Sequence, residues 1–403
     1  MNASISFINQ YSQIESAPLN PIDFIDQKIH RPKLKVLGLG GGGTNAVNRM
    51  IELGIQGVDF IAANTDYQAL NNSLSPVKIQ LGPKTTRGLG AGGDPEVGRT
   101  AAKESWKNIA SALEGADMVF LTAGLGGGTG TGASPVAAEI ARHLGTVTIA
   151  IVTTPFSFEI GRRQRNAKDG LAHLRPKTDT LIAIPNDRLL YIAPRDLPLE
   201  TAFRLADDVL RQAVQGITEL ITQPGIINVD FANIRHLMKL GGGALMAIGQ
   251  GDGENKALKA IQQALHHPLL DSACLDNAAG ILVNFTCGED LTLCEVETAL
   301  QYLTEQTGSQ AEIVMGIIND ARLEDRIEAI LIVTGLGAPT LEEAMGKIAG
   351  QPQASARGNQ SDPLITDRVS SQSHSTNEIH VQEALYSTSN QDLDTPAFLR
   401  RTR

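Results

Sequence analysis

The segment GLGGGTGTG, residues 124–132, contains six glycines and two threonines in nine positions and directly follows the apolar run ADMVFLTA. Glycine loses more backbone entropy on folding than any other residue, so a cluster of this kind is costly to order. Two explanations are open. The segment is either a mobile surface loop or a stretch of bare backbone against which a ligand lies.

Another glycine cluster, GLGGGGTN at residues 38–45, follows the predicted strand LKVLG and opens a predicted helix. In chain order it is the first cluster, and residues 124–132 form the second cluster. Glycines at such a junction expose unpaired N–H groups at the positive end of the helix dipole, where phosphate binds well. Neither cluster contains the lysine of the P-loop motif, which argues against a P-loop NTPase. In the other cluster, Thr129 and Thr131 can donate hydroxyl hydrogen bonds to phosphate oxygens. Together the two clusters predict a polyphosphate site.

The first cluster also satisfies the Gly-x-Gly-x-x-Gly pattern of dinucleotide-binding folds, and Asp66 lies roughly where such folds place their ribose-binding acid. By itself this motif slightly favours a nicotinamide-dependent oxidoreductase. The second cluster shifts the balance, because a dinucleotide fold needs no further phosphate loop with alternating threonines. The oxidoreductase remains an alternative, although the sequence lacks a catalytic constellation for it.

Apolar periodicity predicts the fold class. Up to about residue 200, short apolar runs such as DMVFLTAG and VTIAIVTTP alternate with longer amphipathic runs such as PVAAEIARHLG. This alternation is typical of a doubly wound, Rossmann-like α/β domain with a mainly parallel sheet. Such sheets bind ligands at the carboxyl ends of their strands, where both glycine clusters lie.

The pattern changes near residue 201. The run TAFRLADDVLRQAVQGITELITQ is apolar on more than one face, which predicts a long helix buried between two bodies. A smaller unit follows, with strands near GILVNFT, EIVMGII and AILIVTG, and beyond about residue 350 the composition is that of a disordered linker. We expect six parts: an N-terminal arm over 1–33, a nucleotide-binding domain over 34–200, a central helix over 201–224, a smaller α+β domain over 225–345, a linker over 346–391 and a terminal peptide over 392–403.

Composition excludes several classes of function. The net charge is −10 without a block of lysines or arginines, so nucleic acid is not an expected partner. The longest apolar runs are too short to cross a bilayer, and the N-terminal residues lack the apolar core of a targeting peptide. Cys274, Cys287 and Cys294 have neither metal-ligand nor redox spacing. We expect a protein of a reducing cytoplasm without a metal site built from its own side chains.

The segment GLGGGTGTG resembles the tubulin signature, and the chain from about residue 34 to about residue 338 resembles the FtsZ family of bacterial tubulin relatives. The matching motifs occur in order and include GGGGTNAVNRM, NTDYQAL, GLGAGGDPEVGR, PFSFE, IPND and AVQGITELITQPGIINVDFA. The resemblance implies a tubulin-like fold with a GTP-binding domain, a central helix and an α+β activation domain. It also implies a self-assembling GTPase of the division ring at the septum, with GTP or GDP and Mg²⁺ as ligands. Cyanobacterial members are the nearest expected relatives.

By matching position, the resemblance assigns the nucleotide contacts. They are Gly41, Gly42, Gly43, Thr44 and Asn45 in the first loop, with Asn45 reaching the guanine; Gly92 and Gly93 over the γ-phosphate; Gly128, Thr129, Gly130 and Thr131 around the phosphates; Glu159 at the ribose with Arg163 beside the nucleotide; and Phe203 stacked on the base with Asp208 accepting from its exocyclic amine.

Four of these residues have plainer explanations on residue type and spacing. Glu159 and Arg163, at positions i and i+4, are spaced as a surface ion pair. Phe203 is by default a core residue of an apolar helix. Asp208 is by default a solvated acid near the start of that helix.

The loop NVDFANIR, residues 228–235, follows the long helix. In the family this loop enters the nucleotide pocket of the next subunit and its acidic residues polarise the attacking water. The resemblance therefore implies Asp230 as the principal catalytic residue, assisted by Asn228. The residues alone favour Asp230 as the N-cap of the following helix.

Asn233 departs from the family pattern, which has a second aspartate at this position. An asparagine can orient a water but carries no charge and is a poor proton acceptor. We therefore expect a slow GTPase, and a second alternative is a structural filament that binds GTP, hydrolyses it weakly and co-assembles with an active paralogue. Lesser departures are Ile160, where the family has glycine, and Asp207, where it has asparagine.

Two kinds of partner are expected. A hydrolytic site divided between subunits implies a head-to-tail homopolymer, because heterologous contacts build open filaments. The linker is a flexible tether, and the closing DTPAFLRRTR combines Phe398 and Leu399 with three arginines. This segment is similar to the family's C-terminal anchoring peptide, which implies docking to a membrane-tethered division adaptor. We expect no direct membrane insertion and a cytoplasmic location at the division site.

Overall fold

The computed structural model of the chain describes residues 32–191, 197–270, 278–307 and 311–336. The expected linker over 346–391 and terminal peptide over 392–403 lie outside the described residues, as do Cys274 and nearly all of the expected arm over 1–33. All described residues belong to one structural unit.

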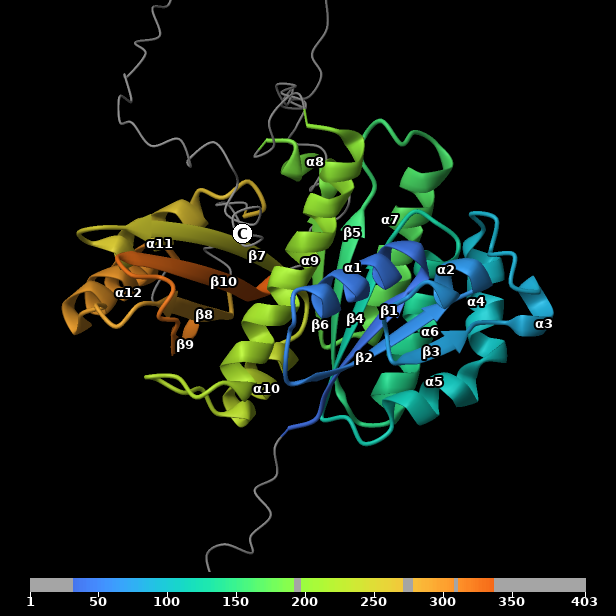
Figure 1. Cartoon of the computed structure of the whole chain (residues 1–403), viewed down its shortest axis with the longest axis horizontal. Coiled ribbons are helices and arrows are strands. Elements are labelled where there is room, and N and C mark those ends of the chain that lie inside the picture. The colour runs from blue at the N-terminus through green and yellow to red at the C-terminus, as the bar shows by residue number, and fades with distance from the viewer. Residues whose placement is uncertain (1–31, 192–196, 271–277, 308–310, 337–403) are drawn as a thin grey trace, which may run out of the picture. The chain divides into compact units, whose positions relative to one another are not determined.

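The described strands form one ten-stranded sheet (Figure 1). They are β1 (Leu34–Leu39), β2 (Val58–Asn64), β3 (Val77–Gln80), β4 (Met118–Gly124), β5 (Val147–Thr154), β6 (Thr180–Pro185), β7 (Gly243–Asp252), β8 (Gly280–Cys287), β9 (Glu312–Asn319) and β10 (Arg326–Leu336). Their order in the sheet is β3-β2-β1-β4-β5-β6-β7-β10-β8-β9. The pairs from β3 to β6 are parallel, which confirms the predicted doubly wound class. In the second half β10 runs antiparallel to both β7 and β8.

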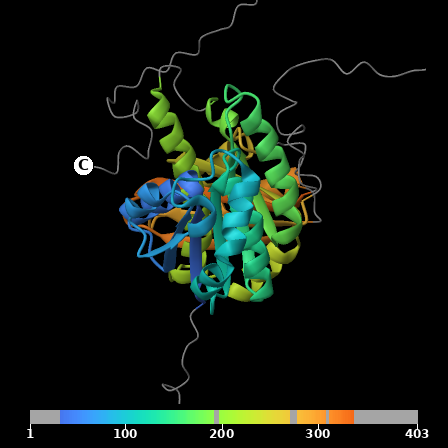
Figure 2. The ribbon, with the colours of Figure 1, turned by 90° about the vertical axis from the view of Figure 1, so that its right-hand side faces the viewer.

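Helices cover both faces of the sheet. They are α1 (Gly40–Glu52), α2 (Tyr67–Asn71), α3 (Pro83–Thr86), α4 (Pro95–Glu104), α5 (Trp106–Leu113), α6 (Thr129–His143), α7 (Arg162–Leu174), the 3₁₀ helix η2 (Arg175–Lys177), α8 (Asn186–Leu189), α9 (Leu199–Thr222), α10 (Phe231–Lys239), α11 (Lys256–Leu265) and α12 (Leu293–Thr307). In the first half of the sheet, α1 and α9 pack on one face and α4 to α7 on the other (Figure 2).

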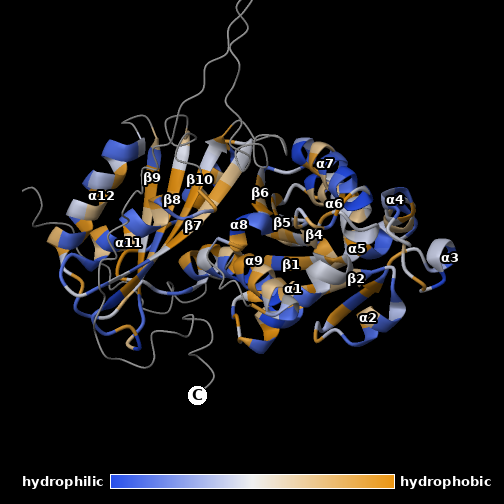
Figure 3. Cartoon of the chain, turned by 90° about the horizontal axis from the view of Figure 1, so that it is seen from above, coloured by the Kyte–Doolittle hydropathy of each residue, from blue (hydrophilic) through white to orange (hydrophobic). Residues whose placement is uncertain are grey.

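The long helix α9 joins the two halves of the fold. Its residues Val214 and Ile217 belong to the same buried cluster as Phe120 of β4 and Ile330 of β10. This cluster contains residues from strands of both halves of the sheet, and these strands consist mainly of hydrophobic residues (Figure 3). The prediction of a helix buried between two bodies is therefore confirmed. The helix spans 24 residues and begins two residues before the predicted start.

The two halves of the sheet meet at a narrow seam. β6 and β7 pair only through Leu181 with Gly243 and Ile182 with Ala244. Beyond the seam, α11 and α12 pack on the opposite face of the sheet from α9 and enclose a separate core cluster that includes Phe285. The second half is thus a smaller α+β layer that shares its sheet with the first.

The described residues contain no group of three or more His, Cys, Asp or Glu side chains that could hold a metal ion. Cys287 is buried in β8, Cys294 is exposed on α12, and both are free thiols. Within the described ranges, no helix combines the length and apolar character that crossing a bilayer requires.

Candidate functional site

The N-termini of α1 and α6 meet at the carboxyl ends of β1 and β4. Neither helix has a side-chain cap, and neither has an acidic residue in its first turn. The first N–H groups of a helix have no partner within the helix and carry the positive end of its dipole. The two helices therefore offer backbone donors to an anion at one place.

Glycine is required where these two segments touch. Gly40 has a φ of +71°, and a Cβ at this residue would lie 2.8 Å from the backbone N of Gly130. A Cβ on Gly130 would lie 2.5 Å from the carbonyl oxygen of Gly124. At Gly41, in contrast, a Cβ would have no atom within 4 Å. Some of the glycines therefore allow backbones to pack, whereas Gly41 leaves backbone facing open space.

The threonines of the second glycine cluster contact protein groups. Thr129 Oγ1 lies 2.6 Å from Thr65 Oγ1 at the end of β2, which links the second cluster to a third strand end. Thr131 is buried, and its Oγ1 accepts a 2.9 Å hydrogen bond from the N–H of Gly126. The buried Thr44 hydroxyl has no hydrogen-bond partner among the described residues. Half-buried Thr129 is thus the more accessible of the two cluster threonines, and Thr131 braces the loop.

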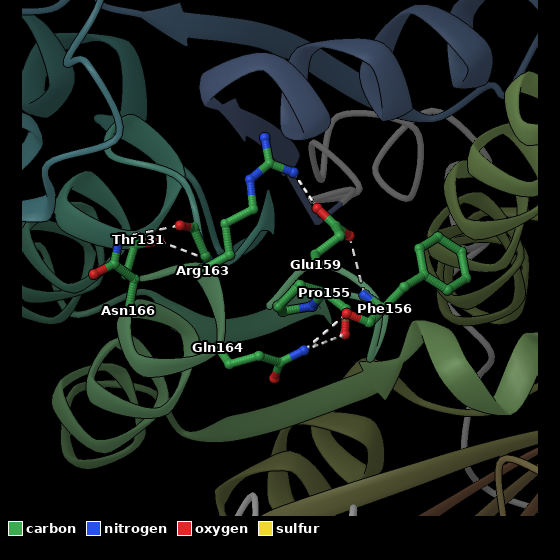
Figure 4. Close-up of polar contacts among 8 residues, drawn as sticks. Thr131, Pro155, Phe156, Glu159, Arg163, Gln164 and Asn166 are labelled. Carbon is green, nitrogen blue, oxygen red and sulfur yellow. Dashed lines mark hydrogen bonds and ion pairs between the residues drawn. The ribbon is translucent and has the colours of Figure 1, made fainter. Parts of the chain in front are cut away.

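Asn166 on α7 is a site residue that the sequence analysis missed (Figure 4). Its Nδ2 donates to the carbonyl oxygens of Gly93 at 3.0 Å and Gly126 at 3.1 Å. One side chain therefore ties the loop before α4 to the loop before α6. Its position three residues after Arg163 on a helix was the available signal, because residues three apart share a helix face.

Glu159 and Arg163 form the ion pair that their spacing predicts (Figure 4). The Glu159 carboxylate, 9% exposed, also accepts a 3.0 Å hydrogen bond from the N–H of Phe156. The Arg163 side chain is 61% exposed. Glu159 is therefore a fixed, shielded carboxylate in the loop between β5 and α7, and Arg163 is an exposed cation that pairs with it.

Phe203 is not the core residue that its type predicts. Its side chain is 38% exposed, and its ring packs edge to face on Phe156 with centroids 5.5 Å apart. Phe156 in turn stacks on Phe158. One part of the Phe203 ring is thus supported by an aromatic neighbour and another part faces solvent.

Asp208 is not the solvated acid that its type predicts. It is 3% exposed and pairs with Arg211, with Nε 2.7 Å from Oδ1 and Nη2 3.3 Å from Oδ2. The i, i+3 spacing could have indicated this pair. Burial raises the pKa of the neighbouring Asp207 to about 7; the charge of Arg49 on α1 opposes this rise and that of Asp208 adds to it.

The residues predicted to act in hydrolysis lie after the end of α9. Asp230 stands at the N-cap position of α10, as its type predicts, but its carboxylate makes no capping hydrogen bond and is exposed. Asn228 Oδ1 accepts a 2.7 Å hydrogen bond from the N–H of Gly225, which closes the loop. Asn233 is exposed and lies three residues after Asp230, on the same face.

The predicted nucleotide residues differ in exposure. Gly41, Asn45, Gly92, Gly93, Arg163 and Phe203 are exposed; Gly42, Thr129 and Glu159 are half-buried; Gly43, Thr44, Gly128, Gly130, Thr131 and Asp208 are buried. The contacts described above bring the loops before α1, α4 and α6 together. Helix α7 joins them through Asn166, and Phe203 contacts Phe156 in the loop between β5 and α7.

The predicted hydrolytic residues do not join this group within one chain. Phe203 lies in the second turn of α9, whereas Asn228, Asp230 and Asn233 lie beyond the last turn. At 1.5 Å per residue, the helix from Phe203 to Thr222 is about 28 Å long. Figure 1 accordingly has α8 near one end of α9 and α10 near the other.

Comparison with known proteins identifies the two halves. Residues 33–194 match the family model "Tubulin/FtsZ family, GTPase domain", and residues 242–337 match "FtsZ family, C-terminal domain". An empty FtsZ dimer from M. jannaschii is 44% identical, with a TM-score of 0.73 over 78% of this chain and 90% of that chain.

Two more distant structures share the fold alone. CetZ2 from Haloferax volcanii, a GTPγS-bound protofilament, is 20% identical with a TM-score of 0.67, covering 78% of this chain and 97% of that one. CetZ1 from the same organism, a GDP-bound monomer, is 20% identical with a TM-score of 0.68, covering 78% and 98%. The expected nearness to cyanobacterial members stays a prediction.

These matches exclude the nicotinamide-dependent oxidoreductase. Asp66, the expected ribose-binding acid of such an enzyme, has a structural role instead. Its Oδ1 caps α2 by accepting from the N–H groups of Gln68 and Ala69 at 2.9 and 3.1 Å. The first half of the chain is a GTPase domain, and a GTPase domain binds GTP and GDP. Both halves match family models and the M. jannaschii FtsZ is 44% identical over 78% of the chain, so the chain belongs to the FtsZ family of tubulin-like GTPases.

Proposed function

We propose that this GTPase assembles head to tail into a filament of the cell-division ring and hydrolyses GTP in a site shared by two copies. One copy supplies the glycine loops before α1 and α6, and the next copy supplies Asp230. One observation carries the proposal: the glycine loops and Asp230 stand at opposite ends of α9, which is about 28 Å long between Phe203 and Thr222. A nucleotide at the glycine loops meets the Asp230 loop only when it comes from a second chain.

The nucleotide would lie with its phosphates at the paired N-termini of α1 and α6. Gly41 leaves room for it, and Thr129 reaches it with a hydroxyl. The exposed part of the Phe203 ring offers a stacking surface for guanine. The family resemblance assigns Asp208 as the acceptor for the guanine N–H groups, a role that its carboxylate, 3% exposed, would share with its pairing to Arg211. Mg²⁺ would be held by the phosphates and by water, since the described side chains offer no three-ligand cluster and Mg²⁺ commonly binds in this way.

In hydrolysis the protein's part is to position and polarise a water. Asp230 is suited to this, because its exposed carboxylate makes no capping bond. Asn228 fixes the loop through Gly225, and Asn233 presents an amide on the same face. The missing second carboxylate lowers the turnover rate. Membership of a GTPase family disfavours the alternative of an essentially inactive structural filament.

The role in division rests on family membership and on the terminal sequence. We propose that DTPAFLRRTR docks to a membrane-tethered division adaptor and that the preceding linker tethers the filament to it. A cytoplasmic location at the division site follows from this role.

A complementation experiment tests the shared site. Asp230→Ala keeps an intact nucleotide site but loses the carboxylate. Gly41→Asp places a negative charge at the phosphates without a clash, because a Cβ at this position has no neighbour within 4 Å. Each variant alone should hydrolyse GTP at least 100-fold more slowly than the wild type. An equimolar mixture should recover about a quarter of wild-type turnover per contact, since random pairing joins a competent nucleotide site to a competent Asp230 in one contact out of four.

Gly41→Ala is the matched control, with the same backbone change but no charge, and should retain turnover. Recovery should also rise with total protein concentration. If the mixture stays as inactive as its components while both variants remain folded by circular dichroism, the shared site is wrong.

A further inference from the structure

An open groove of about 1080 Å³ lies between α12 and the outer edge of β9. Its walls include Ile226, Leu293, Leu300 and Met315. Ile226 is 64% exposed and Leu293 is 82% exposed, so the groove presents a wide apolar surface to solvent. We call it the α12 groove. In Figures 1 and 3, α12 and β9 lie side by side at one end of the described fold.

The charged side chains that line the α12 groove are both acidic. Glu297 and Glu305 lie on α12, and Gln301 stands between them at the same helical spacing, so the three form one stripe. No lysine, arginine or histidine belongs to the lining, and α12 has no basic residue in its last turn. A ligand that is apolar at its centre and basic at its end would match this surface.

The edge of β9 adds backbone groups to the α12 groove. Ile317 exchanges hydrogen bonds with Ile227 on its outer side. Because strand residues alternate in direction, the backbone N–H and C=O of Met315, two residues earlier, point to the same side. An extended peptide could therefore pair with this edge as well as fill the groove.

The chain carries a segment of this composition at its own C-terminus. In DTPAFLRRTR, residues 394–403, Phe398 and Leu399 are followed by Arg400, Arg401 and Arg403. We propose that this terminal segment docks in the α12 groove of its own chain, with Phe398 and Leu399 against the apolar walls and the arginines beside Glu297 and Glu305.

The connection is long enough for docking within one chain. β10 ends at Leu336 and is separated from β9 by β8 alone, which is about 10 Å across the sheet. Residues 337–397 number 61, and a flexible chain of this length would have a root-mean-square span of about 43 Å. Tethering of this kind produces an effective concentration on the order of millimolar, so a weak contact is sufficient to hold the segment.

Docking would restrain assembly. Ile226 and Ile227 belong to the same loop as Asn228 and Asp230, so a segment seated on them covers the surface that the next copy needs. An adaptor that takes the segment would uncover this surface and so couple filament growth to the membrane. The docking itself is independent of the proposed function, but this consequence rests on it.

Photocrosslinking in the full-length chain tests the docking. The chain carries p-benzoyl-phenylalanine in place of Phe398, is kept dilute with GDP, and is irradiated before the crosslinked peptides are mapped by mass spectrometry. We expect crosslinks within one chain to α12 or to residues 226–227, with a yield that does not change over a tenfold dilution. Three outcomes would each overturn the proposal. They are crosslinks to another surface, crosslinks between chains with a yield that rises with concentration, and the absence of any specific crosslink.

A charge exchange separates specific docking from general attraction. Glu297→Lys with Glu305→Lys should lower the yield at least fivefold, and Arg400→Glu with Arg401→Glu should do the same, while the four changes together should restore it. The matched control is Glu254→Lys with Glu324→Lys, which reverses two exposed acids of the same half outside the α12 groove and should leave the yield unchanged. Failure of the four-fold variant to restore the yield would contradict the assigned contacts.

The consequence is measured separately by the critical concentration for GTP-dependent pelleting. Arg400→Glu with Arg401→Glu should lower it about two- to fivefold, because the loop is then uncovered. If the crosslinks are specific but Arg400→Glu with Arg401→Glu leaves the critical concentration unchanged, the segment docks in the groove but does not cover a subunit contact. Loss of crosslinks in a chain that still assembles would reject the docking and leave the proposed function intact.

Discussion

The carboxylate of Asp208 lies against the guanidinium of Arg211 on α9, and both side chains are almost fully buried. Arg211 also donates to Gln215, so its guanidinium group is hydrogen-bonded to both Asp208 and Gln215. A buried charge that loses its partner typically costs about 3–5 kcal/mol. Arg211→Met should therefore lower the free energy of unfolding by about 3 kcal/mol in urea titrations, because Asp208 is left unpaired.

The double variant with Asp208→Asn checks the cause of this loss. It should be more stable than Arg211→Met alone, since no buried charge remains. Strictly additive losses would show that the two side chains act independently.

Asn166 joins two loops of the nucleotide site through the carbonyl oxygens of Gly93 and Gly126. A net hydrogen bond contributes about 1 kcal/mol, so loss of both bonds in Asn166→Ala should weaken GTP binding by roughly 10- to 30-fold, measured with a fluorescent nucleotide. The exposed Arg165→Ala on the same helix is the control and should change affinity less than threefold. An unchanged affinity in Asn166→Ala would mean that the two loops are held without it.

Asn233 shares a helix face with Asp230 and lacks the charge that the family resemblance predicts at this position. Asn233→Asp should raise phosphate release per assembled subunit several-fold, because a second carboxylate can polarise the attacking water. The pelleted fraction with a slowly hydrolysed GTP analogue should not change. Equal turnover in the wild type and the variant would reject a role for Asn233 in setting the rate.

Asp207 makes stability depend on pH. Its pKa is raised by burial from 3.8 to about 7, so the folded chain binds a proton that the unfolded chain has released. The free energy of unfolding should therefore fall as the pH rises from about 4 to about 7 and then level off. Asp207→Asn should flatten this slope and stabilise the fold above pH 7 by about 2–4 kcal/mol.

Chemical unfolding between pH 4.5 and pH 8 measures this effect. The exposed Asp59→Asn serves as the control and should leave the slope unchanged. A slope that persists in Asp207→Asn would assign the pH dependence to other groups.

The sequence predicted what is local. Glycine clusters after strands, the parallel alternation and the long helix all depend on short-range patterns, and the structure contains them. The antiparallel placement of β10 between β7 and β8 depends on pairing between distant segments, for which the strand sequences carry no register. The other differences between prediction and structure arise from tertiary packing. Asn166 acts through carbonyl groups that the fold brings to it. The exposure of Phe203 and the burial of Asp208 depend on which elements cover them.

The narrow seam between β6 and β7 has a mechanical consequence. Two residue pairs join the halves of the sheet there, whereas α9 packs along strands on both sides. A pulling force between the halves is therefore carried by apolar side chains sliding along α9, and hardly at all by a ladder of strand hydrogen bonds that would resist shear. In the filament that we propose, each subunit would therefore be most compliant at this seam.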